Sequence, residues 1–188
     1  EMCIRDRHCT LEGSIITEFS YEFKPWNVLD KIKSRSLTAL DEYEKVLIHN
    51  VEVETETGKV VKREKRLDLN EYNIGRVQFD VIMYEKDSSV FSLLNVEKKG
   101  LNDYLKENSG IRVYRDNMRV FDYGEPGNDW LSIDKRRLSR SGGSISNSLL
   151  LGSVMLDRIS SYGLREKTNR EGFIEDEAYF AFVDAISY

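Results

Sequence analysis

A period-two alternation of apolar residues does most to narrow the folds open to this chain. Between residues 76 and 84, every second position is apolar: Val77, Phe79, Val81 and Met83. A strand produces this spacing, because its successive side chains point to opposite faces of a sheet. The alternation therefore predicts a strand with one apolar face.

Further segments rich in β-branched and aromatic residues predict more strands. They cover residues 14–23, 43–54, 60–69, 111–115, 118–121 and 149–156. Thr57-Gly58 predicts a hairpin turn, after which the chain is expected to continue into the 76–84 strand as a meander. Asp116-Asn117 predicts a tight primed turn, because asparagine tolerates positive φ. The apolar run 149–156 fits a strand buried on both faces.

Two segments predict helices. Residues 88–108 place several leucines on one face, and Gly110 is suited to end that helix in the left-handed conformation. Residues 174–188 show one apolar face at helical spacing: Ile174, Ala178, Ala181, Phe182, Ala185 and Ile186. The order of strands, helix, strands and helix predicts an α+β two-layer sandwich, with a mixed, mainly antiparallel sheet and helices on one face.

Composition and the first residues limit the possible functions. A net charge of −5 argues against a protein that coats nucleic acid. No apolar run approaches the roughly 20 residues needed to cross a bilayer, so we expect no membrane partner and a cytoplasmic location. Glu1–Arg7 is similar to a translated sequencing adapter, so residues 1–13 are expected to be a non-native or disordered tail. The domain is then expected to span 14–188 and to be incomplete at both ends. No metal site is predicted, because Cys3, His8 and Cys9 do not make a closed zinc site.

A cationic loop precedes the predicted C-terminal helix. Thr168 and Glu171 have the spacing of a capping box, which would place Lys167 and Arg170 beside a helix N-terminus. Backbone N–H groups and two cations at one place favour an anion such as a phosphate. The alternative is that Thr168 and Glu171 only cap the helix, while the two cations pair with nearby acids such as Glu166 and Glu175.

Three segments together resemble one known family. They are Ser109–Asp116, Tyr123–Leu131 and Lys167–Glu175. In this order they resemble the second, or transducer, domain of large bacterial ATP-binding proteins of the GHKL superfamily. That superfamily includes gyrase, MutL, MORC and the ninety-kilodalton heat-shock chaperone. The resemblance covers roughly residues 14–188 and is strongest from Leu105 onward.

The resemblance implies a ribosomal-protein-like transducer fold and a role in an ATPase. ATP and magnesium would be bound mainly by an upstream domain of the same chain, whose asparagine and glycine boxes this sequence lacks. Arg170, and less directly Lys167, would act as catalytic residues at the γ-phosphate, with Thr168 and Asn169 as cofactor-binding residues. This fragment alone is expected not to hydrolyse ATP. Further partners consistent with the resemblance are a second copy of the chain, a client protein or nucleic acid.

Other functions stay open on the residues alone. The basic runs at 59–66 and 135–140 could contact nucleic-acid phosphates, although solvated basic faces are the simpler interpretation. A purely structural interaction module is the remaining alternative. His49 has no neighbours in sequence that would complete a catalytic triad, and no phosphate-binding or dinucleotide-binding glycine loop is present.

Overall fold

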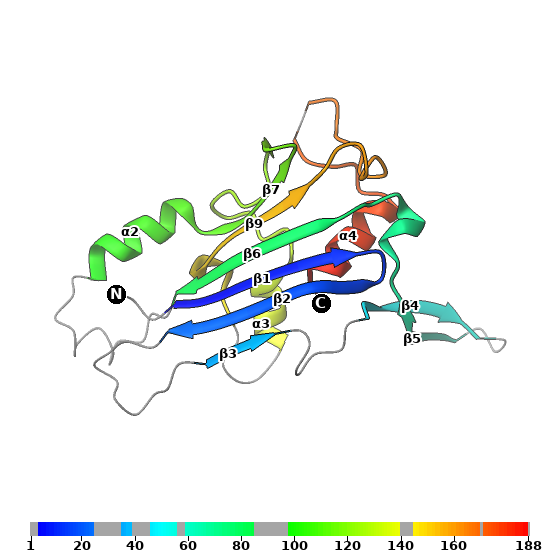
Figure 1. The fold of residues 1–188 in the computed structure, drawn as a ribbon, viewed down its shortest axis with the longest axis horizontal. Coiled ribbons are helices and arrows are strands. Elements are labelled where there is room, and N and C mark those ends of the chain that lie inside the picture. The colour runs from blue at the N-terminus through cyan, green and yellow to red at the C-terminus, as the bar shows by residue number, and fades with distance from the viewer. Residues whose placement is uncertain are drawn as a thin grey trace.

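The computed structural model describes residues 4–24, 35–38, 46–55, 59–84, 98–139, 145–169 and 171–187. Seven strands form one sheet in the order β3-β2-β1-β6-β9-β7-β8, and β4 and β5 form a separate two-stranded sheet. Helices α3 and α4 lie behind the larger sheet in the view of Figure 1. The predicted α+β two-layer class is therefore confirmed.

The larger sheet is mixed and mainly antiparallel, as predicted, because only the β7–β9 pair is parallel. Its strands are β1 (Ile4–Glu12), β2 (Ile15–Lys24), β3 (Arg35–Thr38), β6 (Val77–Tyr84), β7 (Gly110–Arg115), β8 (Met118–Val120) and β9 (Leu150–Leu156). The smaller sheet contains β4 (Ile48–Glu54) and β5 (Val60–Arg66). The helices are α2 (Lys98–Asn108), α3 (Ile133–Ser139) and α4 (Glu177–Ser187), with short 3-10 helices η1 (Leu69–Tyr72) and η2 (Asn147–Leu149).

The core lies between the apolar face of the larger sheet and α4. Val77 and Val81 of β6 are buried, as the period-two alternation predicts, and belong to one core with Phe182 and Ala185 of α4. Burying this apolar surface is the main favourable contribution to folding. On the opposite face, β6 carries Gln78 and Asp80 followed by Ile82 and Tyr84, so one face of the sheet packs against α4 and the other is partly polar.

The disorder expected for a tail at residues 1–13 is wrong for the described residues of that segment. Residues 4–12 form β1, which lies between β2 and β6 within the larger sheet. Leu11 is buried in the core, and Cys9 packs against it. A segment with hydrogen-bonded strands on both sides satisfies its backbone groups and cannot behave as a terminal tail. The position of the segment at a chain end was therefore a poor guide to its structure.

The sequence predicted a local turn correctly but did not predict how the strands pair. Asp116 and Asn117 have φ values of 50° and 63°, which confirms the primed turn between β7 and β8. The predicted meander is wrong, because β4 and β5 pair only with each other while β6 pairs with β1 and β9. The expected turn at residues 57–58 and the first part of the 88–108 helix lie outside the described residues.

The capping box predicted at Thr168 and Glu171 is also wrong. Helix α4 begins at Glu177, and the carboxylate of Asp176 accepts a hydrogen bond from the Tyr179 N–H at 3.2 Å. Asp176 is therefore the residue that caps the helix, because its side chain satisfies a donor in the first turn. Thr168 and Glu171 instead belong to a bend that precedes the helix.

Candidate functional site

The segment that carries the predicted site residues is the return loop, defined here as residues 157–176, which leads from β9 to α4. Within it, the Lys167 N–H donates to the Gly172 carbonyl at 2.9 Å, and the Ile174 N–H donates to the Arg165 carbonyl at 2.8 Å. An antiparallel bridge joins Glu166 to Phe173. These contacts form a short ladder that closes a bend, and the described residues at its tip are Lys167, Thr168, Asn169 and Glu171.

A buried arginine organises the first half of the return loop. Arg115, the last residue of β7, is only 7% exposed. One terminal nitrogen donates to the Leu164 carbonyl at 2.7 Å and to the Glu166 carboxylate at 3.2 Å. The other donates to the carbonyls of Ser161 at 2.8 Å and Arg158 at 3.3 Å. A guanidinium suits this task because its donors project in a fixed planar fork.

A buried tyrosine anchors the second half of the return loop. The Phe173 N–H donates to the hydroxyl oxygen of Tyr123 at 2.9 Å, and the two rings lie 5.6 Å apart. Burial raises the pKa of Tyr123, so the hydroxyl stays protonated at neutral pH. Gly172, with φ of 85°, passes so close that an added Cβ would lie 3.1 Å from this hydroxyl. Tyr123 therefore fixes the chain where it leaves the tip.

Close contacts also join the segment Ser109–Asp116 to the segment Tyr123–Leu131, beside the base of the return loop. Gly124 has φ of 71°, and an added Cβ would lie 2.6 Å from backbone atoms of Ile111. The indole N–H of Trp130 donates to the Ile111 carbonyl at 2.8 Å, and its ring stacks on Phe182 of α4. Trp130 is therefore a packing anchor, because its ring is packed against α4 and its N–H has a backbone partner. All three segments of the resemblance meet around the base of the return loop.

The described residues of the tip are exposed. Lys167 pairs with Glu175 at 3.5 Å, with side chains 43% and 62% exposed. Asn169 donates to the Glu171 carboxylate at 2.7 Å, and Thr168 is exposed beside it. Arg170, the principal predicted site residue, lies outside the described residues. The structure thus brings Lys167, Thr168 and Asn169 together at one surface.

The predicted contribution of a helix N-terminus to this site is wrong. The first turn of α4 is capped by Asp176, whose carboxylate also accepts a hydrogen bond from Arg165 at 2.8 Å. That hydrogen bond from Arg165 is the largest effect that lowers the pKa of Asp176. The positive end of the helix is therefore occupied by a carboxylate of the same chain, and an anion at the tip would depend on side chains and loop N–H groups.

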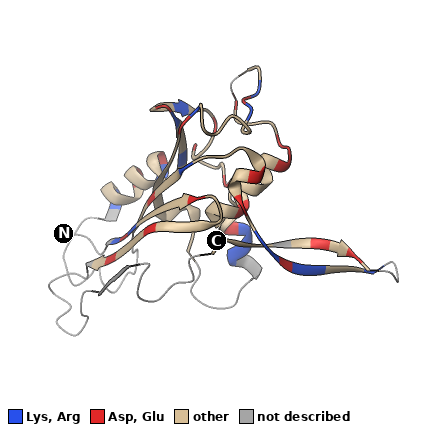
Figure 2. Ribbon diagram, turned by 45° about the vertical axis from the view of Figure 1, so that its right-hand side comes forward, with Lys and Arg blue, Asp and Glu red and all other residues tan. Residues whose placement is uncertain are grey.

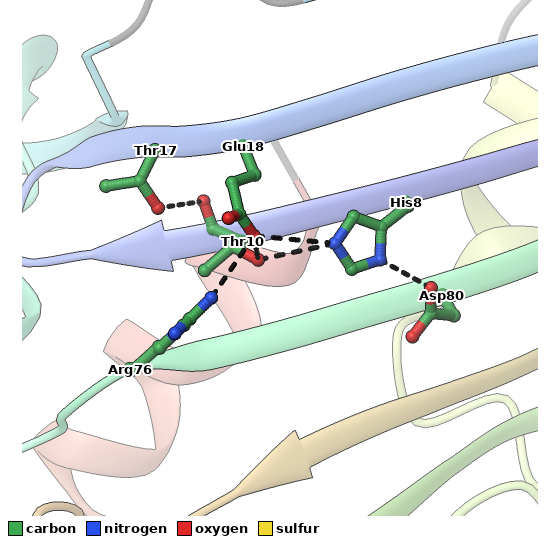
Figure 3. Close-up of polar contacts among 6 residues, drawn as sticks. All are labelled: His8, Thr10, Thr17, Glu18, Arg76 and Asp80. Atoms are coloured by element: carbon green, nitrogen blue, oxygen red, sulfur yellow. Dashed lines mark hydrogen bonds and ion pairs between the residues drawn. The ribbon is translucent and has the colours of Figure 1, made fainter.

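A second polar cluster lies on the uncovered face of the larger sheet, with α4 passing behind the strands (Figure 3). His8 Nδ1 lies 2.6 Å from the Asp80 carboxylate, and the Thr10 hydroxyl donates to Glu18 at 2.8 Å. The hydrogen bond with Asp80 raises the pKa of His8, and the one from Thr10 lowers the pKa of Glu18. Arg76 also pairs with Glu18, at 3.1 Å.

This cluster does not form a nucleophilic site. Its order of threonine, histidine and aspartate resembles that of a catalytic triad, but Thr10 is 0% exposed and its hydroxyl lies 3.5 Å from His8 while it donates to Glu18. Sequence reasoning missed the cluster because its histidine and threonine lie in the segment set aside as a tail. The five side chains join three neighbouring strands across the polar face.

The two basic runs lie on separate elements. Four cations on β5 are exposed along the two-stranded sheet, which extends away from the larger sheet beside the acidic residues of β4 (Figure 2). On α3, Arg136 donates to the Leu131 carbonyl at 3.0 Å. Arg140 lies outside the described residues. Nδ1 of His49 lies 3.3 Å from the Asp184 carboxylate, so this contact links β4 to α4.

Within the part of the chain that the structure describes, no group of three histidine, cysteine or acidic side chains is placed to hold a metal ion. Over those same residues, none of the helices combines the length and apolar character that a membrane span requires. No protein-family model matches the chain, and neither a curated protein nor a solved structure shows significant similarity to it.

Proposed function

We propose that this chain is the transducer domain of a GHKL-type ATPase. In this proposal, the tip of the return loop supplies a cation to the γ-phosphate of ATP, which an ATP-binding domain of the same polypeptide holds together with magnesium. One observation carries the proposal: the three segments of the resemblance are in mutual contact. Hydrogen bonds join Trp130 to Ile111 and Phe173 to Tyr123, the Arg115 guanidinium lies beside the Phe173 ring, and the exposed Lys167 is held next to these contacts.

The chemistry follows from the charge of the tip. A cation delivered from a second domain stabilises the negative charge of the transferring phosphoryl group, as arginine fingers do. The same contact would be lost when the γ-phosphate leaves, so it would link the nucleotide state to the position of the domain. Arg170 is assigned the main role, and Lys167 the supporting one.

The ion pair of Lys167 does not prevent this role. Both side chains of the Lys167–Glu175 pair are well exposed, and exposed pairs contribute only about 0–1 kcal/mol. A triphosphate carries a far higher charge density than one carboxylate, so Lys167 can exchange Glu175 for a phosphate at little cost.

The test uses the complete polypeptide that includes the ATP-binding domain. We expect Arg170→Ala to lower kcat for ATP hydrolysis by about 100-fold or more while ATP affinity changes by less than about three-fold, because the contact forms fully only in the transition state. Lys167→Ala should have a smaller effect in the same direction. Lys62→Ala, an exposed cation on β5, is the matched control and should leave turnover unchanged. Wild-type turnover in both loop variants would overturn the proposal.

A further inference from the structure

We propose that Arg115 is the positioning residue of the return loop, and that its guanidinium sets where the cationic tip stands. The inference rests on the proposed function for its catalytic consequence. Arg115 is the last residue of β7, which pairs with β9, and the following Asp116 N–H donates to the Leu156 carbonyl at 3.0 Å. Its side chain therefore starts from a rigid part of the sheet.

The return loop is folded around this one cation. Three backbone carbonyls, from Arg158, Ser161 and Leu164, point inward to the guanidinium, together with the Glu166 carboxylate. Buried carbonyls need donors, and this single side chain donates to all three, while the Ser161 carbonyl also accepts from the Leu164 N–H at 3.2 Å. Without the guanidinium, these carbonyls would lose their donor, and a different loop conformation that exposes them to water would be favoured.

The contacts of Arg115 lead directly into the base of the tip. Leu164 and Glu166, which accept from Arg115, flank Arg165, where the ladder to Ile174 begins. The guanidinium carbon also lies 5.8 Å from the centre of the Phe173 ring, on the opposite arm of the ladder. Arg115 therefore contacts both arms of the bend whose tip carries Lys167.

The environment of Arg115 favours a positioning role over a purely stabilising one. The Nε atom of Arg115 is buried and has no partner, and within the described residues it is the only such side-chain atom. One carboxylate, that of Glu166, is in ion-pair contact with the buried charge. Burying a charge under such conditions brings little net stability, because desolvation offsets the attraction. What the arrangement does achieve is a single defined path for the loop.

The first measurement is amide hydrogen exchange in this chain. Arg115→Lys keeps the charge but loses the planar fork, so we expect exchange at the Lys167 and Ile174 amides to accelerate about ten-fold, while the Val154 amide in β9 stays unchanged. Glu166→Gln is a milder second variant, which removes only the ion pair and should accelerate the same amides less. The matched control is Arg158→Gln, since the Arg158 side chain is 67% exposed and lies 4.0 Å from the same carboxylate.

The second measurement is ATP turnover in the complete polypeptide. We expect Arg115→Lys to lower kcat about ten-fold with an unchanged KM for ATP, whereas Arg158→Gln changes neither. Unchanged exchange at Lys167 and Ile174 overturns the inference. Faster exchange with unchanged kcat also overturns it if Arg170→Ala impairs turnover. If Arg170→Ala and Lys167→Ala are both silent as well, the proposed function falls together with the inference.

Discussion

The contact between Gly124 and the start of β7 allows a quantitative test of how the family-like segments are joined. Gly124 has φ of 71°, where a residue other than glycine costs about 1–2 kcal/mol. In Gly124→Ala, the new Cβ would also lie 2.6 Å from the carbonyl carbon and oxygen of Ile111 and 2.8 Å from the Arg112 nitrogen. These are backbone atoms that cannot rotate away, and overpacking of this kind costs about 1–3 kcal/mol. We therefore expect a total loss of about 2–5 kcal/mol.

Gly127→Ala separates the two contributions. Gly127 lies in the same loop and has φ of 89°, but an added Cβ would meet nothing within 4 Å. This variant should lose only the conformational part, about 1–2 kcal/mol. The difference between the two variants then measures the clash with β7 alone.

The assay is urea unfolding of both variants, followed by tryptophan fluorescence, since Trp130 lies beside this contact. The free energy of unfolding should fall about 1–3 kcal/mol further in Gly124→Ala than in Gly127→Ala. Equal losses in the two variants would refute the reasoning, because the close approach of Gly124 to Ile111 would then carry no energetic weight.

Two further predictions concern stability. The hydrogen bond with Asp80 raises the pKa of His8 above 6.5, so its stabilising contribution is fully present below pH 6.5 and is lost as the pH rises through the folded-state pKa. Asp80→Asn should reduce the fall in the free energy of unfolding between about pH 6 and about pH 9, measured by urea unfolding. The reduction should be about 1 kcal/mol or less, because the His8 side chain is 35% exposed, and an equal fall in both proteins would contradict this. Tyr123→Phe removes the acceptor of the buried Phe173 N–H and should cost about 1–3 kcal/mol. Tyr162→Phe, which removes an exposed hydroxyl, is the control, and a loss as large as that of Tyr123→Phe would count against the anchoring role.

Part of the candidate site could be predicted from sequence because it depends on residues close together in the chain. Lys167, Thr168 and Asn169 do share one exposed bend, and the alternative pairing of Lys167 with Glu175 is also present. The capping residue was placed wrongly because Thr168 and Asp176 both suit a helix start by residue type. Only the backbone path, which is fixed by Arg115 and Tyr123 from distant strands, determines which of them is used.

The sequence by itself determined the strand β6, the primed turn at Asp116-Asn117 and the apolar face of α4, because each depends on spacing within a few residues. Tertiary structure alone decided that residues 4–12 lie between β2 and β6 and that Arg115 is buried beneath a loop some fifty positions later. Strand order and buried polar networks depend on contacts between remote residues. Their free energy comes from desolvation and partner geometry, which no local pattern encodes.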